Sequence, residues 1–238
     1  VVDRSGWKQK HGKLPQGRGF GLACSAYMCG AGVAIYWNKM PHSGVQLLLD
    51  RRGQVTVMCG ATEIGQGSDD VLAAIVAEVL GITTADIRCV TGDTGLTPID
   101  LGSYSSRVTL MMGNAAVQAA GRVRELIVTA AAEQLETLPE RVVLSQGRVY
   151  AAEDSGKSMS FVEAVVLAEA KFGTLGAVGS YAPGKPPGKF KGANVGPSPA
   201  YTFSACVVEA EVDERTGLIH IPKIWIAHDI GQAINAVH

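Results

Sequence analysis

The sequence has almost no net charge, no long apolar run and an odd number of cysteines. Its 21 basic and 22 acidic residues leave a net charge of −1, which argues against a nucleic-acid-binding surface. No segment approaches the roughly 18 consecutive apolar residues of a membrane span, and no signal peptide opens the chain. The five cysteines favour a reducing, cytoplasmic compartment, and no Asn-x-Ser/Thr acceptor site occurs.

Metal-ligand spacing is also missing. Cys24 and Cys29 have the gap found in one half of a plant-type iron–sulfur motif, but the third cysteine would fall at Gly32, so no cluster is predicted. None of the histidines pairs with another at ligand spacing, and no metal-ligating residue is predicted. The histidines are at positions 11, 42, 220, 228 and 238.

The residues that are present describe a globular chain. Hydrophobic residues make up 47% and charged residues 18% of the 238 positions, with 29 glycines, which excludes a disordered composition. The length suits one large domain or two small ones. The chain begins at Val1 without a methionine and ends at His238 just past a patterned strand, so we expect a fragment of a longer or processed polypeptide.

Periodicity and turn signals predict strands and helices in alternation. A helix is expected at 68–80, with Ser68 as its N-cap and Gly81 as its stop. A second helix is expected at 108–135, whose small residues suggest close packing against another element. A Gly- and Pro-rich stretch, 173–199, is the one long loop predicted. The other expected elements are strands at 20–37, 45–50, 54–59, 87–91, 201–213 and 218–228, a hairpin at 142–151, and a capping-box helix after Ser160.

The stretch 59–70, Cys-Gly-Ala-Thr-Glu-Ile-Gly-Gln-Gly-Ser-Asp-Asp, joins a strand to a helix. Its glycines allow tight turning and close approach to a ligand. Free N–H groups at the helix start suit an anion such as a phosphate. Gln66, between Gly65 and Gly67, can donate and accept at once, as recognition of a heterocycle requires. The alternative is a strand-to-helix turn with nothing bound.

A second polar helix start lies at 102–109. Tyr104, Ser105, Ser106, Arg107 and Thr109 gather hydroxyls and a guanidinium there, a combination that suits phosphate. The alternative is a decorated N-cap. Both helix starts follow strands, where ligand sites of α/β-type units form. One long ligand with a phosphate and a heterocycle could therefore span them.

Three other chemistries have little support. The segment 179–185 matches most of a nucleotide-binding P-loop, but Pro186 stands where Ser or Thr must hold magnesium. The pair Gly65 and Gly67 lacks the third glycine of a dinucleotide fingerprint, because position 70 is Asp. No Gly-x-Ser-x-Gly elbow surrounds Ser105 or Ser106. His228 beside Asp229 could be a base with its orienting partner, although such a strand-end pair is more often structural.

Three motifs in order resemble the xanthine oxidase family of molybdenum hydroxylases. Residues 60–67 are similar to its molybdopterin-contacting motif, residues 102–109 to its second cofactor loop, and residues 225–235 to the strand and turn before a further loop. The resemblance implies an α+β fold of mixed β-sheets flanked by helices, the second cofactor-binding lobe. It implies a lead-in segment at 1–22 and a molybdenum-cofactor-binding domain at 23–238, truncated at its C-terminal side.

The resemblance also assigns residues. The loop glycines and Gln66 would contact the pterin or the metal's oxygen ligand, and the second motif would hold the phosphate end. The implied cofactor-binding residues are Gly65, Gln66, Gly67, Tyr104, Ser105, Ser106, Arg107 and Thr109. The family's proton-abstracting glutamate lies beyond the position matching His238. No catalytic residue is therefore assigned within the chain, and Glu63 matches a motif position rather than that base.

The implied parent is a cytoplasmic, oligomeric molybdenum oxidoreductase. Its cofactor would be molybdenum-molybdopterin, with a cytosine-dinucleotide form as one alternative, and its partners would be iron–sulfur and FAD-bearing subunits or domains. Residues 28–32 and 173–199 are most similar to the large subunit of 4-hydroxybenzoyl-CoA reductases, which implies reductive dehydroxylation of an aromatic CoA thioester. The alternatives are a hydroxylase of purines, aldehydes or carbon monoxide, and a non-catalytic scaffold of the same fold. The fragment alone is expected to be inactive.

Overall fold

A computed structural model describes residues 1–30, 39–184 and 198–233. Contacts divide the chain into two compact units, one of Val1–Cys29 with Ser198–His238 and one of Gly30–Pro197. The boundary predicted after residue 22 falls within strand β1 (Arg18–Cys29), and the domain assignment based on it stays a prediction.

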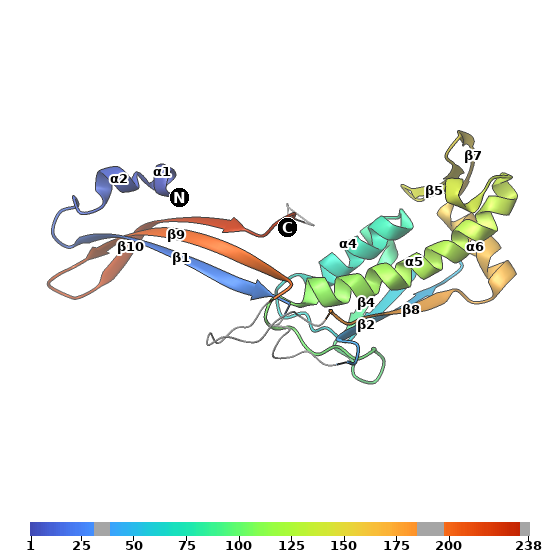
Figure 1. Ribbon diagram of the computed structural model, residues 1–238, viewed down its shortest axis with the longest axis horizontal. Helices are drawn as coiled ribbons and strands as arrows, with labels where there is room; N and C mark the ends of the chain where they lie inside the picture. Colours follow the sequence, from blue (N-terminus) through green and yellow to red (C-terminus); the bar gives the residue numbers. More distant parts are fainter. Residues whose placement is uncertain (31–38, 185–197, 234–238) are drawn as a thin grey trace. The chain divides into compact units, whose positions relative to one another are not determined.

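The larger unit is built on a four-stranded mixed sheet (Figure 1). Its strands are β2 (Ser43–Leu49), β3 (Val55–Cys59), β4 (Ile87–Thr91) and β8 (Gly176–Tyr181), in the order β4-β3-β2-β8. β2 and β3 form the predicted hairpin, and β3 runs parallel to β4. The inward side chains of β2 and β3 alternate with outward ones and form the apolar core.

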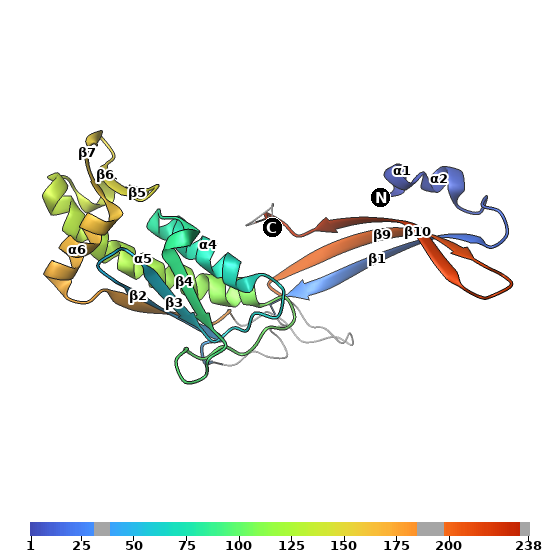
Figure 2. The same cartoon turned by 180° about the vertical axis from the view of Figure 1, so that it is seen from behind.

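Two helices, α4 (Ser68–Leu80) and α5 (Val108–Leu135), pack on one face of this sheet (Figures 1 and 2). Both have the predicted bounds, and Gly81 ends α4 in the left-handed conformation, as expected. The close packing predicted for the small residues of α5 is confirmed at β8. A Cβ on Gly179 would lie 2.0 Å from the carbonyl oxygen of Ala115 and 2.7 Å from the amide of Ala119.

The far end of this unit carries a small antiparallel sheet and a third long helix. The sheet contains β5 (Val142–Ser145), β6 (Arg148–Ala151) and β7 (Asp154–Ser160), and it leads into α6 (Phe161–Phe172). The predicted capping box is present: Ser160 accepts from the amide of Glu163, whose carboxylate accepts from the amide of Ser160. Short 3₁₀ turns at Thr84–Asp86 and Pro139–Arg141 precede β4 and β5.

The smaller unit is a three-stranded antiparallel sheet in the order β1-β9-β10, with β9 (Ala200–Val212) and β10 (Ile219–Asp229) as the predicted closing strands. Two single-turn helices, α1 (Val2–Ser5) and α2 (Trp7–Lys10), precede it. Trp7 stacks on Phe20 with ring centroids 5.4 Å apart. Lys10 donates to Glu209, a buried carboxylate of β9, at 3.0 Å.

The predicted α+β class with mixed sheets is confirmed, two local predictions are wrong, and one strand was missed. Residues 176–181 form strand β8 rather than loop, because small glycine-rich residues can pair with β2 while lying close to α5. The polar strand β7 was missed because it lacks apolar alternation. Ser68 is the first helical residue rather than the N-cap, which is Gly67. Residues 31–37 of the predicted first strand and 185–197 of the predicted loop lie outside the described residues.

None of the helices in the described ranges combines the length and the apolar character needed to cross a lipid bilayer.

Candidate functional site

The two polar helix starts predicted from the sequence meet in one pocket of about 360 Å³ in the larger unit. One wall is the loop that opens α4, and the other is the loop that opens α5. Six of the eight predicted cofactor residues line it, and the other two, Gly65 and Gly67, are the chain neighbours of Gln66. The lining residues are Ile64, Gln66, Ser68, Val71, Ser103, Tyr104, Ser105, Ser106, Arg107, Val108 and Thr109.

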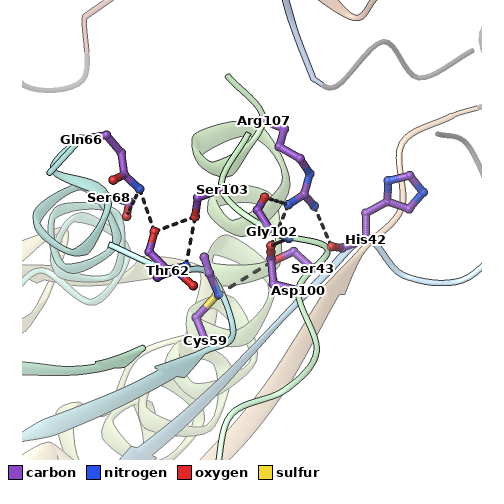
Figure 3. Close-up of polar contacts among 11 residues, drawn as sticks. His42, Ser43, Cys59, Thr62, Gln66, Ser68, Asp100, Gly102, Ser103 and Arg107 are labelled. Atoms are coloured by element: carbon purple, nitrogen blue, oxygen red, sulfur yellow. Dashed lines mark hydrogen bonds and ion pairs between the residues drawn. The ribbon is translucent and has the colours of Figure 1, made fainter. Parts of the chain in front are cut away.

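Direct hydrogen bonds tie the two loops together (Figure 3). The amide of Thr62 donates to Ser103 Oγ at 3.0 Å, and the Ser103 hydroxyl donates to the carbonyl of Thr62 at 2.6 Å. Gly60 lies against the same second loop, because a Cβ there would be 2.4 Å from the carbonyl oxygen of Pro98. The expected close approach at this glycine is therefore to the chain itself.

The N-terminus of α4 is already filled by the chain's own carboxylate. Glu63 Oε1 accepts from the amides of Gly65 and Gly67 at 2.6 and 3.1 Å, and Oε2 accepts from the amide of Asp69 at 3.2 Å. The bond from Asp69 is the largest of the influences that lower the pKa of Glu63 to about 2. The prediction of free N–H groups for an external anion is therefore wrong for Asp69 in the first turn and for Gly65 and Gly67 in the loop before it, since Glu63 accepts from these three amides.

Gln66 has its amide engaged within the loop. Its Nε2 donates to the carbonyl of Thr62 at 3.0 Å and to Ser68 Oγ at 2.8 Å, while its Oε1 accepts from the amide of Ile64 at 2.6 Å. Gly65 and Gly67 have φ angles of 96° and 77°, which explains why glycine stands at both positions. Among the described residues, neither glycine would meet another atom within 4 Å if a Cβ were added.

The start of α5 is open by contrast. Arg107 is its N-cap position but makes no capping hydrogen bond, and no acidic residue lies in its first turn. Its N–H groups therefore present the positive end of a 28-residue helix to the pocket. The hydroxyls of Ser105, Ser106 and Thr109 have no hydrogen-bond partner within the described ranges.

Ser105 and Ser106 also have left-handed backbones, with φ angles of 51° and 46°. Two consecutive non-glycine residues in this region cost roughly 1–2 kcal/mol each. Such strain gathers at ligand sites, where the surrounding structure holds it in place. The strained pair turns this loop into the helix at the edge of the pocket.

The sequence predicts that Arg107 binds a phosphate, but in the structure its guanidinium binds groups of the chain itself. Its guanidinium is fully buried beneath the loop and donates to Asp100 Oδ1 at 2.7 Å, to the carbonyl of Gly102 at 2.6 Å and to the carbonyl of His42 at 2.7 Å (Figure 3). Asp100 is equally buried. The pair fastens the second loop to the beginning of β2, and the ring of Tyr104 lies 5.7 Å from the guanidinium carbon.

Sequence reasoning thus missed Asp100 and the carbonyl of His42, which fix Arg107, and it missed the capping role of Glu63. Asp100 gives a local signal, an acid seven residues before an arginine. The carbonyl of His42 comes from 65 residues away and gives none.

Two thiols lie under the site and are not nucleophiles at neutral pH. Burial raises the pKa of Cys59 to about 11 and that of Cys89 to about 12. Across the described ranges no cluster of three His, Cys, Asp or Glu side chains is placed to hold a metal ion. His228 shares a 2.7 Å hydrogen bond with Ser204 Oγ, so Ser204 rather than Asp229 orients its ring.

The pocket between the two loops thus offers hydroxyls and a helix start, donors that suit a ligand with an anionic end. The sequence model of the molybdopterin cofactor-binding domain matches residues 1–237. The chain therefore belongs to this family, within the molybdenum hydroxylases related to xanthine oxidase.

Two curated relatives illustrate the match. The chain is 31% identical over 232 residues to the 6-hydroxypseudooxynicotine dehydrogenase complex subunit gamma of Paenarthrobacter nicotinovorans, covering 97% of this chain and 28% of that protein. It is 36% identical over 140 residues to the putative xanthine dehydrogenase molybdenum-binding subunit XdhA of Escherichia coli K12, covering 57% of this chain and 18% of that protein. The chain thus spans less than a third of either relative.

The fold is also that of solved enzymes. Quinoline 2-oxidoreductase from Pseudomonas putida 86 superposes with a TM-score of 0.78 at 25% identity, over 98% of this chain and 30% of that one. The Cu,Mo-CO dehydrogenase superposes with a TM-score of 0.76 at 24% identity, over 99% of this chain and 29% of that one. The latter likeness concerns the fold alone.

Proposed function

We propose that this chain is the part of a molybdenum oxidoreductase's large subunit that forms one wall of its molybdopterin site. The observation that carries the proposal is the open start of α5, where Ser105, Ser106 and Thr109 hold three hydroxyls with no partner in the described parts of the chain. In a chain of this family, those hydroxyls and the first N–H groups of α5 would hold the phosphate end of the cofactor. The loop at Gly65–Gly67 would border its pterin side.

The cofactor, when bound, would supply the oxygen transfer and take up the electrons. The chain's own residues bind and orient it. Arg107 and Asp100 hold the second loop at the beginning of β2, so the hydroxyls keep their place. Glu63 accepts four hydrogen bonds and has a pKa of about 2, so it is no proton acceptor at neutral pH. We therefore assign no proton-abstracting step to Glu63.

The reaction class we propose is exchange of oxygen with water at a carbon of an aromatic or heteroaromatic substrate. Relatives are named for quinoline, nicotine, xanthine, aldehydes and carbon monoxide. These names favour hydroxylation of a heteroaromatic ring. Reductive dehydroxylation of 4-hydroxybenzoyl-CoA stays a second candidate, supported by the sequence of residues 28–32 and 173–199. Residues 31, 32 and 185–197 of that support lie outside the described ranges.

We further propose a multi-subunit parent. Relatives are named as a complex subunit gamma, a large subunit and a large chain, which supports separate partner subunits for this protein. The proposal adds that these partners carry the iron–sulfur and flavin groups. A cytosine-dinucleotide form of the cofactor would place its pyrophosphate along the hydroxyls of the second loop.

Purification of the full-length protein with its native partners tests the function. We expect molybdenum and a fluorescent pterin after oxidation, and acid release of a nucleotide identifies the cofactor form. Turnover is then compared for quinoline, xanthine, an aromatic aldehyde, carbon monoxide and, with a reduced donor, 4-hydroxybenzoyl-CoA. A preparation without molybdenum and without pterin would replace this function by the scaffold alternative.

A further inference from the structure

The loop between β3 and α4 is organised around one carboxylate. Glu63 draws three backbone N–H groups of residues 65–69 toward itself, and it also accepts from the Ser68 hydroxyl at 3.3 Å. Four donors on one side chain define the path of the loop, because the backbone of Gly65 and Gly67 has no side-chain packing of its own to hold it.

The same carboxylate sets the direction of the hydrogen bonds that reach Gln66. A carboxylate can only accept, so the single proton of the Ser68 hydroxyl points to Glu63. Ser68 Oγ must then accept from Gln66, and the amide nitrogen, which lies 2.8 Å away, is the only end of Gln66 that can donate. The chain Glu63–Ser68–Gln66 therefore specifies which end of the amide is nitrogen.

The other contacts of Gln66 agree with that orientation. Nε2 also faces the carbonyl of Thr62, an acceptor, and Oε1 faces the amide of Ile64, a donor. A neutral side chain at position 63 could donate to Ser68 and reverse its hydroxyl, which would remove one of the three constraints on the amide. Because its pKa is lowered to about 2, Glu63 is charged near neutral pH.

We propose that Glu63 is the positioning residue of this site: through backbone N–H groups and Ser68 it fixes the 62–69 loop and the orientation of the Gln66 amide that faces the cofactor. The ordering of the loop stands on the contacts above. The consequence for the cofactor rests on the proposed function.

Three variants of the full-length protein test the assignment. Glu63→Gln keeps the shape and removes the charge. Ser68→Ala removes the relay to Gln66 and leaves the three backbone contacts of Glu63. Glu163→Gln is the matched control, because Glu163 also accepts an N–H at a helix start, that of α6, and lines no part of this pocket.

Hydrogen–deuterium exchange of the peptide covering 62–70 is the first measurement. We expect exchange in E63Q to be about fivefold faster at the amides of Gly65, Gly67 and Asp69, as loss of a helix cap implies. In E163Q that peptide should exchange at the wild-type rate, and in S68A it should exchange more slowly than in E63Q, because Glu63 keeps its three backbone donors. Equal exchange in E63Q and wild type would overturn the positioning role, whatever the metal content.

The electron paramagnetic resonance signal of the molybdenum(V) state is the second measurement, taken after molybdenum content is determined. We expect a changed signal in E63Q and in S68A and a wild-type signal in E163Q. An unchanged S68A signal would overturn the relay to Gln66, and it remains decisive if E63Q fails to fold. A wild-type protein that holds neither molybdenum nor pterin would overturn the proposed function instead, while the exchange data still decide the role of Glu63 in the loop.

Discussion

Replacing Arg107 by methionine separates the two roles that this arginine could have. If the guanidinium served mainly a phosphate, its loss would leave the cofactor-free protein as stable as before. The structure instead gives it three oxygen partners in a fully buried position, one of them the carboxylate of Asp100. We therefore expect R107M to destabilise the protein before any cofactor is bound.

The size of the effect follows from the hydrogen bonds that the substitution removes and from the buried Asp100 carboxylate that it leaves without its arginine. Three charge-assisted hydrogen bonds are lost. Within the described ranges, the buried Asp100 carboxylate then keeps one donor, the amide of Gly102 at 2.8 Å. Removing one partner of a buried pair typically costs about 3–5 kcal/mol. Neutralising the stranded acid as well, in R107M/D100N, should recover about 1–3 kcal/mol, because neighbouring sites in one network are not additive.

Urea unfolding of the cofactor-free protein measures these changes in a double-mutant cycle of wild type, R107M, D100N and R107M/D100N. The unfolding free energy should fall by about 3–5 kcal/mol in R107M and partly return in the double variant. A loss below about 1 kcal/mol, or a double variant no more stable than R107M, would refute the structural role of the buried pair.

Other expectations follow from individual positions. G179A should destabilise the protein by about 1–3 kcal/mol or more, because its Cβ would overlap the backbone of α5. G121A lies within α5 with no described atom within 4 Å of its Cβ, so it should stabilise the protein by up to about 1 kcal/mol. Thermal unfolding of both variants measures these changes. The pKa of Glu63 falls from an ordinary 4.5 to about 2 in the folded chain, so its contribution is complete above about pH 4.5 and is lost as the pH falls toward 2. Amide exchange of its loop, corrected for intrinsic rates, should therefore stay constant from pH 8 to pH 5, and loosening near pH 5 would contradict the low pKa. Cys59 and Cys89 should react with iodoacetamide at pH 7.5 only under denaturing conditions, as mass spectrometry of the labelled peptides would show.

Much of the larger unit could be predicted because its local signals agree with its packing. The alanine-rich run of α5 favours helix and also fits beneath a glycine of β8, so propensity and tertiary contact point the same way. Strand β8 itself was not predictable, since its glycines indicate a loop until a helix is known to lie against them. Strand β7 is polar and lies at the edge of its three-stranded sheet, paired with β6, which leaves no alternation to detect.

The candidate site was predictable in place but not in its internal contacts. Two glycine- and hydroxyl-rich helix starts were expected to share a ligand, and they line the same pocket. Which charges remain available could not be deduced, because the carboxylate of Glu63 and the terminal guanidinium nitrogens of Arg107 both bind groups of the chain itself. Glu63 binds backbone amides a few residues further along the chain, and Arg107 binds the backbone carbonyl of His42. Every residue type offers these backbone groups, so the sequence gives no signal for either contact.

The molybdenum and pterin content of the S105G/S106G variant of the full-length protein tests most directly the proposal that the start of α5 holds the cofactor. Glycine accepts the left-handed backbone of both positions, so the variant removes two hydroxyls without adding strain. S158A, which removes a hydroxyl from the distant strand β7, is the control. We expect content to fall about tenfold or more in S105G/S106G, as loss of charge-assisted hydrogen bonds implies, and to stay at the wild-type level in S158A. Wild-type molybdenum and pterin in S105G/S106G would contradict the assignment of the α5 start as the anion end of the site.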